Sequence, residues 1–77
     1  MDSANLRRVL ARNLRAVAQR RGLALGAIAD FAGVSRSQIY DVVACRKAAT
    51  VDWIAKVAAA LGVGAHRLLD PDFDVAD

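Results

Sequence analysis

Side chains that could perform catalysis or hold a metal ion are scarce in this sequence. It contains one cysteine, Cys45, and one histidine, His66, so it cannot form an internal disulfide or build a metal site from both types. No carboxylate pair, Ser/His/Asp set or glycine-rich phosphate loop is recognisable. We therefore expect a protein that is not an enzyme and uses no metal or cofactor, with Cys45 inert and His66 on the surface.

The basic side chains are more informative, because they are unevenly distributed. Residues 1–47 hold nine basic and three acidic side chains, whereas residues 48–77 hold two basic and five acidic ones. A basic body with an acidic tail is typical of a protein that meets a polyanion, such as nucleic acid, with one face. Nine of the eleven basic residues are arginine and no residue is glutamate, so biased codon usage is an alternative cause of this asymmetry.

These side chains must be positioned by one small domain, since the chain has 77 residues. With 56% hydrophobic residues, the chain is too apolar to be disordered. No stretch approaches the roughly 20 apolar residues of a membrane span. Arginines throughout the first 21 residues argue against a secretory signal. The composition predicts a soluble, cytoplasmic protein.

Helical signals cover nearly the whole chain, and no segment has the pattern of a strand. The first helix is predicted from about Asn5 to Arg21, with Asp2 or Ser3 near its N-cap and Gly22 at its end. Four further helices are predicted at about 25–32, 35–44, 50–61 and 65–69. The expected fold class is therefore all-α, a compact five-helix bundle over residues 1–71, followed by an acidic C-terminal tail at 72–77.

Apolar residues at three- and four-residue spacing give the longer helices one buried face each. In the first helix the predicted stripe comprises Leu6, Val9, Leu10, Leu14, Val17 and Ala18. In the fourth helix it comprises Val51, Ile54, Val57, Ala58 and Leu61. Three aromatic residues fall outside the stripes, namely Phe31, Tyr40 and Trp53. They could contact another chain, or each could fold flat over its own helix.

The segment 25–44 has the properties of a helix-turn-helix. Ala29 is small enough to let two crossing helices approach closely, and Gly33 supplies the positive φ that the turn between them needs. Ile39 and Val42 would attach the second helix of the pair to the core. This geometry presents a helix to the major groove of DNA.

From about Leu14 to Leu69 the sequence resembles the phage lambda-repressor-like (Cro/cI, Xre-type) helix-turn-helix domains. The resemblance is carried by the segment GLALGAIADFAGVSRSQIYDVVACRKAATVDWIAKVAAALGV, which includes a downstream helix ending in Ala-Leu-Gly-Val. It implies a five-helix fold with the helix-turn-helix in helices two and three. It also implies a bacterial or phage transcriptional regulator that binds operator DNA, usually as a homodimer.

By position, the resemblance makes the third helix the recognition helix. The expected base contacts are Arg36, Ser37, Gln38, Tyr40 and Asp41. Arg36 can pair bidentately with guanine O6 and N7. Asp41 can accept a hydrogen bond from cytosine N4, or it can be a solvated partner of Arg36 or Lys47. The expected phosphate contacts are Ser35, Arg46 and Lys47.

The sequence departs from the family pattern at several positions. Ala24 and Leu25 stand where the family usually has a polar N-cap and a phosphate-holding glutamine, and Ala44 and Cys45 stand where it often has a polar residue and glycine. Ala18 and Val43 replace an arginine and a glutamate that many members join in a largely buried ion pair. Since both partners are replaced by apolar residues, we predict that Ala18 and Val43 lie close together in the core and join their helices by packing alone.

The family commonly dimerises through its C-terminal part, which implies an interface containing Trp53, Leu68, Leu69 and Phe73. Two alternatives to operator binding stay open. One is a protein-interaction module that keeps the repressor fold with weak or no DNA binding, and the other is the antitoxin of a toxin–antitoxin pair. The missing phosphate clamps and the aromatics outside the stripes favour a protein partner. Arg36, Arg46, Lys47 and the basic N-terminal half favour operator DNA.

Overall fold

A computed structural model describes residues 2–74, and within that range the chain forms five α-helices and no strand. They are α1 (Ser3–Arg21), α2 (Leu25–Ala32), α3 (Arg36–Val43), α4 (Val51–Leu61) and α5 (Ala65–Leu68). The predicted all-α, five-helix fold is confirmed. Helix α1 starts slightly earlier than predicted, because Asp2 is its N-cap and accepts the N–H of Asn5 at 2.7 Å.

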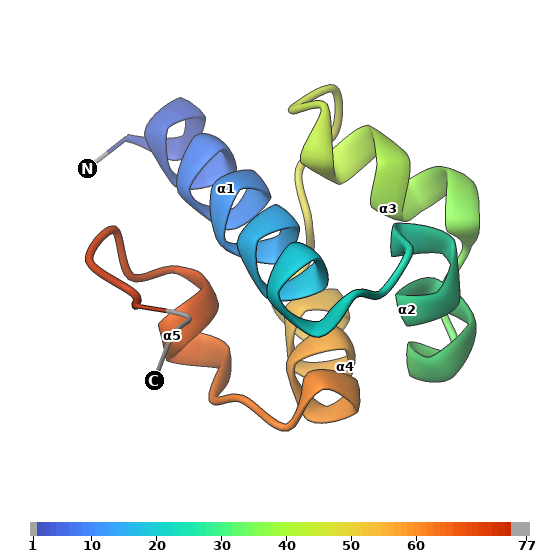
Figure 1. Cartoon of the computed structure of the whole chain (residues 1–77). Coiled ribbons are helices and arrows are strands. Elements are labelled where there is room, and N and C mark those ends of the chain that lie inside the picture. The colour runs from blue at the N-terminus through green and yellow to red at the C-terminus, as the bar shows by residue number, and fades with distance from the viewer. Residues whose placement is uncertain (1, 75–77) are drawn as a thin grey trace.

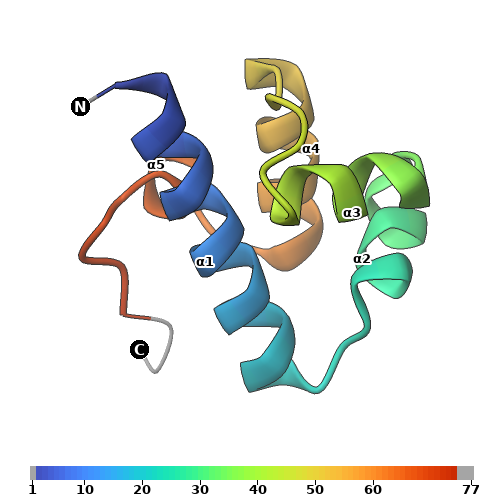
Figure 2. The ribbon, with the colours of Figure 1, turned by 90° about the horizontal axis from the view of Figure 1, so that it is seen from above.

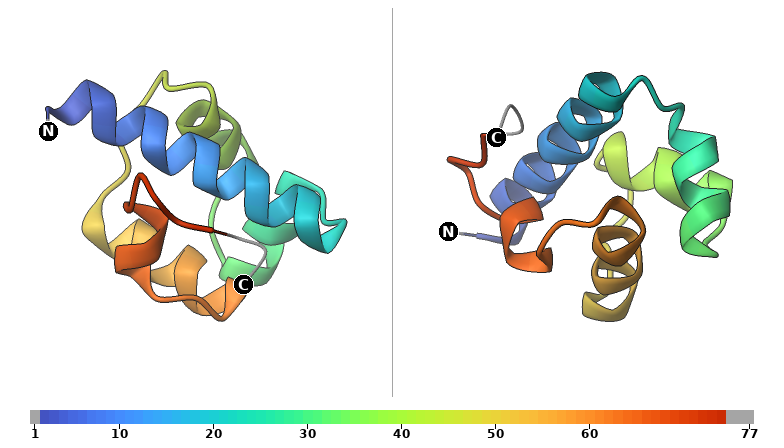
Figure 3. Two further views of the ribbon diagram at one scale, coloured as in Figure 1. Left: turned by 60° about the vertical axis from the view of Figure 1, so that its left-hand side comes forward. Right: turned by 60° about the horizontal axis from the view of Figure 1, so that its bottom comes forward.

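The five helices pack around one core. Figure 1 shows α1 and α5 on one side of the molecule and α2 and α3 on the other. Helix α3 packs against both α1 and α2, as Figure 2 shows from above, and α4 packs against α2 and α5. The segment after α5 turns back beside α1 (Figure 3). None of the helices within residues 2–74 combines the length and apolar character needed to cross a membrane.

Three helices end at a glycine in the left-handed conformation, as the sequence predicts. Gly22, Gly33 and Gly62 have φ values of 64°, 73° and 68°. In each case the N–H of the next residue donates to the carbonyl five residues before it, as Val34 does to Ala29 at 2.9 Å. Gly33 thereby forms the turn that sets α3 against α2, and Ala29 is fully buried at that crossing.

Helix α3 ends with the same backbone geometry, but its left-handed position is occupied by Cys45, with φ 60°. The N–H of Arg46 donates to the carbonyl of Asp41 at 2.8 Å, which matches the bonds that follow the three glycines. The Cys45 side chain is half-buried against the core, with a free thiol. A β-carbon in this conformation costs roughly 1–2 kcal/mol, so the end of α3 is strained.

We expect Cys45→Gly to raise the free energy of unfolding by about 0.5–1 kcal/mol. Glycine removes the left-handed strain, and its extra freedom in the unfolded chain and the lost thiol contact offset only part of that gain. Cys45→Ala is the matched control, because it removes the thiol but keeps the β-carbon, and it should not stabilise. Urea unfolding of the three proteins measures the effect. A glycine variant less stable than the alanine variant would contradict this account.

The core is built from the predicted helix faces. Within α1 the predicted stripe is buried except for half-buried Leu6. Ile39, Val42 and Val43 bury the inner face of α3. Ala18 and Val43 both belong to this core, as predicted, and Val43 is 6% exposed. The prediction that packing alone joins their helices is wrong, since Nη2 of Arg15 in α1 also donates to the carbonyl oxygen of Val43 at 3.2 Å.

The buried face of α4 differs from the prediction at two positions. Trp53, expected on the surface, is 4% exposed, whereas Val51, expected in the core, is 81% exposed. On a helical wheel Val51 lies about 70° and Trp53 about 90° from the centre of Ile54, Val57, Ala58 and Leu61, on opposite sides, so both are at the margins of the stripe and periodicity favours Val51 only slightly. Val51 opens the helix, and helical side chains lean toward the N-terminus, so it extends past the edge of the core. The larger indole reaches inward, although its Nε1 has no hydrogen-bond partner within residues 2–74.

The predicted surface character of Leu68 is also wrong. Leu68 is 0% exposed, because it is the buried side chain of the short helix α5, which packs against α1 and α4. Leu69 and Phe73 are half-buried against the same core. Phe31 and Tyr40 are exposed, as expected from their positions outside the stripes.

A buried asparagine attaches the C-terminal segment to α1. Asn13 is 1% exposed, and its Nδ2 donates to the carbonyl oxygens of Leu68 and Asp70, both at 2.9 Å, and of Arg67 at 3.3 Å. Its Oδ1 accepts from Nη2 of Arg12 at 3.1 Å, and the same Arg12 group also donates to the carbonyl of Pro71. The residues after α4 are therefore held by polar contacts as well as by Leu68.

Candidate nucleic-acid interface

The outward side of α3 carries the side chains predicted to contact DNA bases. Its opposite side is buried, so the exposed residues Arg36, Ser37 and Tyr40 face solvent. Asp41 is half-buried beside them, and Gln38 is half-buried at the flank. The fold thus places the predicted base-contacting residues on and beside one exposed helix face.

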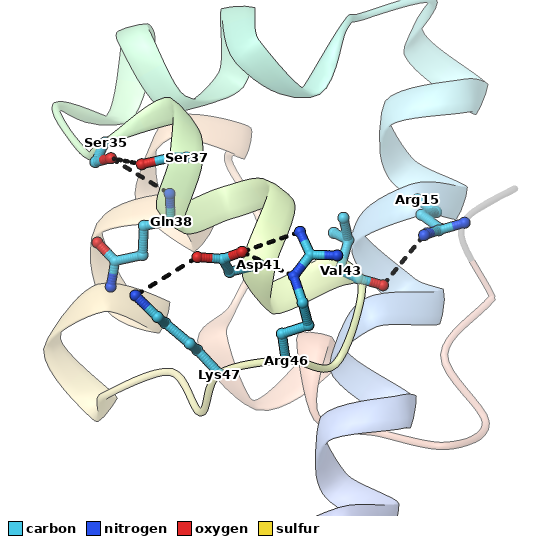
Figure 4. Close-up of polar contacts among 8 residues, drawn as sticks. All are labelled: Arg15, Ser35, Ser37, Gln38, Asp41, Val43, Arg46 and Lys47. Carbon is cyan, nitrogen blue, oxygen red and sulfur yellow. Dashed lines mark hydrogen bonds and ion pairs between the residues drawn. The ribbon is translucent and has the colours of Figure 1, made fainter.

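The start of α3 is fixed by Ser35. Its Oγ accepts the N–H of Gln38 at 3.3 Å, which makes Ser35 the N-cap, as the sequence predicts. The same Oγ lies 3.0 Å from Oγ of Ser37 (Figure 4). The two hydroxyl groups form a small polar cluster at the exposed end of the helix.

Arg36, the first residue of α3, is held by Asp30 of α2. Its Nε donates to Oδ1 of Asp30 at 2.9 Å, and its Nη2 donates to Oδ2 of the same carboxylate. This hydrogen-bonded pair lowers the pKa of the Asp30 carboxyl and raises that of Arg36, first through the hydrogen bonds and also through charge attraction. Asp30 was not predicted as a site residue, although it stands only six residues before Arg36 across the turn.

Arg36 and Tyr40 also lie against the first turn of α2. A β-carbon at Gly26 would be 3.5 Å from Cδ of Arg36 and 3.6 Å from the hydroxyl of Tyr40. Gly26 is buried beneath these two side chains. The stem of Arg36 and the ring end of Tyr40 are therefore placed by contact with α2 as well as by α3.

Asp41 pairs with the two basic residues that follow α3. Its Oδ1 lies 2.9 Å from Nη2 of Arg46, and its Oδ2 lies 3.6 Å from Nζ of Lys47 (Figure 4). Of the two partners considered from sequence, Lys47 is found and Arg36 is not. The pKa of the Asp41 carboxyl is lowered, mainly by its hydrogen bond with Arg46 and then by the charges of Arg46 and Lys47.

A further arginine reaches the end of α3 from α1. The exposed side chain of Arg15 contacts the carbonyl oxygen of Val43, so Arg15 and Arg46 lie at the same end of the helix (Figure 4). Arg15 was not predicted as a site residue and counted only among the arginines of the first 21 residues. Its contact with a residue 28 positions away has no local signal in the sequence.

The start of α2 offers no side chain that could hold a phosphate. Ala24 is its N-cap and makes no side-chain hydrogen bond there, and Leu25 packs partly against the core. The other end of α2 has an apolar surface, where Phe31 is 82% exposed. Phe31 and the exposed Leu23 border a groove of about 160 Å³ whose floor includes Ile28 and Leu61.

The residue types that could bind a metal ion do not come together in a site within the described residues. Within residues 2–74, no three His, Cys, Asp or Glu side chains are grouped so that they could hold a metal ion. His66 is exposed on α5, as the sequence predicts, and Cys45 lies at the end of α3.

Comparison with known proteins agrees with this geometry. Residues 9–70 match the family described as helix-turn-helix domain. Among solved structures, the chain is similar to a hypothetical transcription factor, NHTF, from Neisseria, with 36% sequence identity and a TM-score of 0.85. That similarity covers 94% of this chain and 83% of the other. A search of curated proteins found no match.

Proposed function

Because the chain belongs to the helix-turn-helix domain family, we propose that it is a sequence-specific transcriptional regulator of the lambda-repressor-like (Cro/cI, Xre-type) class. Helix α3 would enter the major groove of operator DNA. The observation that carries the proposal is the exposed polar face of α3, supported from behind by a buried apolar face and fixed by the Gly33 turn. The protein acts by binding, without catalysis or a cofactor.

In this proposal the outward residues of α3 read bases. Arg36 donates to guanine O6 and N7, and Tyr40 contacts a thymine methyl group or a phosphate. Ser37 and Gln38 bond to bases or phosphates. Asp41 can accept from cytosine N4, and its ion pairs also hold Arg46 and Lys47 beside the helix.

Phosphates are bound by Ser35, Arg46 and Lys47, and we add Arg15 to this set. Arg15 and Arg46 bring two guanidinium groups to the C-terminal end of α3, from elements far apart in sequence. Arginine binds phosphate oxygens in a bidentate manner. This pair compensates for Ala24 and Leu25, which replace the usual side-chain clamps at the start of α2.

The regulator binds as a homodimer on a near-palindromic site, with recognition helices about 34 Å apart, one turn of DNA. Trp53 and Leu68 are core residues. The interface that we propose in the C-terminal part therefore rests on the half-buried Leu69 and Phe73. Selection of binding sites from random DNA should return an inverted repeat with this spacing.

Two substitutions test the assignment of contacts on the selected site. Arg36→Ala should weaken operator binding by about 1–3 kcal/mol and relax the preference at one base position. Lys47→Ala should weaken binding to all sequences alike and reduce the slope of log K against log salt by about one unit. Titrations with labelled duplexes at several salt concentrations measure both effects. Lys56→Ala, which removes an exposed lysine from α4, is the matched control for Lys47. An Arg36→Ala protein with unchanged affinity and selectivity would rule out base reading by Arg36.

The exposed apolar surface at Phe31 favours a second candidate function, recognition of a protein. Phe31, Leu23 and the groove between them could seat an apolar side chain of a partner. A protein-interaction module, or an antitoxin that binds both its toxin and DNA, would use this surface. A chain that selects no sequence from random DNA would favour the interaction module.

A further inference from the structure

Asp30 of α2 was not among the predicted DNA contacts, yet it holds the Arg36 side chain. From this contact we infer that Asp30 is a positioning residue for base recognition, which orients the Arg36 guanidinium so that its outer edge reads guanine. The inference rests on the proposed function, in which Arg36 contacts a base. Asp30 acts through Arg36 and touches no base itself.

The hydrogen-bonding pattern leaves the required edge of Arg36 available. A guanidinium carries five N–H donors in a planar fork. Asp30 accepts from Nε and from Nη2, which form one edge of that fork. The adjacent edge, formed by Nη1 and the second hydrogen of Nη2, keeps two parallel donors. Two parallel donors are what the O6 and N7 acceptors of guanine require.

Arg36 is fixed at two points along its length. Its Cδ lies over Gly26, and its guanidinium lies on Asp30, one helical turn further along α2. A long exposed side chain loses rotamer freedom when it binds a base, and this loss opposes binding. Since α2 already restricts Arg36, less freedom is lost on contact with DNA. The Arg36 side chain is therefore already oriented for contact with a base before DNA binds.

The charge of Asp30 distinguishes this function from a general contribution to DNA affinity. The carboxylate is ionised at neutral pH, as an aspartate ordinarily is, and its pairing with Arg36 lowers its pKa further. A negative charge beside a DNA-binding surface repels phosphates on every sequence. Asp30 therefore disfavours non-specific binding while it supports guanine recognition. Removing its charge should change these two properties in opposite directions.

The experiment uses the whole chain and three duplexes: the selected operator, the same operator with the Arg36-dependent guanine replaced by adenine, and a random sequence. Asp30→Asn keeps the shape of the side chain but loses the charge and the bidentate acceptor. We define the guanine ratio as the Kd for the adenine-substituted operator divided by the Kd for the selected operator. We expect Asp30→Asn to lower this ratio about tenfold, toward the value for Arg36→Ala. Binding to the random duplex should strengthen. In an Arg36→Ala background, Asp30→Asn should leave the ratio unchanged.

Asp72→Asn removes the same charge from an exposed position outside the helices and should leave the guanine ratio as it is. Thermal unfolding followed by circular dichroism checks that each variant is folded. If Asp30→Asn tightens operator binding and keeps the guanine preference, then Asp30 sequesters Arg36, and the inference is overturned. If Arg36→Ala keeps the preference, base reading by Arg36 fails and the inference fails with it. A loss of preference in Arg36→Ala but not in Asp30→Asn overturns only the inference.

Discussion

Val43→Glu is expected to lower the free energy of unfolding by about 3–5 kcal/mol, because it places an unpaired carboxylate in the core. Val43 is 6% exposed in the cluster that joins α3 to α1. The basic side chain that reaches Val43 is that of Arg15, which is exposed and donates to the backbone carbonyl of Val43. It would have to leave that contact to follow a carboxylate inward.

Ala18→Arg should recover part of this loss when it is combined with Val43→Glu. Ala18 is buried on the α1 side of the same cluster, three residues after Arg15, so an arginine there approaches the introduced carboxylate. We expect a coupling energy of about 1–3 kcal/mol from a double-mutant cycle. Urea unfolding can be followed by the fluorescence of Trp53, the single tryptophan, which is buried in the folded chain.

Val43→Gln is the control for charge, since it has the size of glutamate without its ionisation. Ala18→Arg should give no recovery in that background. If the effects of Ala18→Arg and Val43→Glu add within about 0.5 kcal/mol, the two positions are not coupled and the prediction that Ala18 and Val43 lie close together is wrong. The cycle bears on the proposed DNA binding too, because the contact between α1 and α3 keeps the proposed recognition helix in place.

The helices were predictable because their boundaries depend on local signals. Ser35 and Thr50 cap the helices that follow them, and Gly33 and Gly62 end the helices that precede them. Each signal acts within a few residues and needs no knowledge of the rest of the fold. The outward position of the α3 side chains follows from the same local periodicity.

Contacts that depend on how the helices meet were not predictable. Val51 and Trp53 lie at opposite margins of the apolar stripe, and the packing of the neighbouring helices decides which one is buried. Arg15 finds its acceptor 28 residues away, and Asn13 finds its acceptors 54 to 57 residues away. A polar residue within an apolar stripe is the sequence signal for Asn13. The signal shows that the side chain needs partners but not which ones.

Asn13→Leu is expected to destabilise the segment after α4 by about 3 kcal/mol. The replacement keeps the number and branching of the side-chain heavy atoms but removes the donors that satisfy the carbonyls of Leu68 and Asp70, and a carbonyl left unpaired away from water costs about 1–3 kcal/mol. Helix α5 is vulnerable because it has four residues and no side-chain N-cap bond, and so short a helix is not stable by itself. Asn13 therefore stabilises a helix that the local sequence cannot.

Hydrogen exchange should locate this effect. In Asn13→Leu, the amides of α5 and the residues after it should lose protection before those of α2 and α3, because the lost bonds join only α1 to the C-terminal segment. Asn5→Ala changes the other asparagine of α1, which is half-buried, and should leave α5 protected. Equal loss of protection in α3 and α5 would show that Asn13 supports the whole core. Since Leu69 and Phe73 lie in the segment that Asn13 holds, the leucine variant should also weaken the proposed dimer while α3, the proposed recognition helix, stays folded.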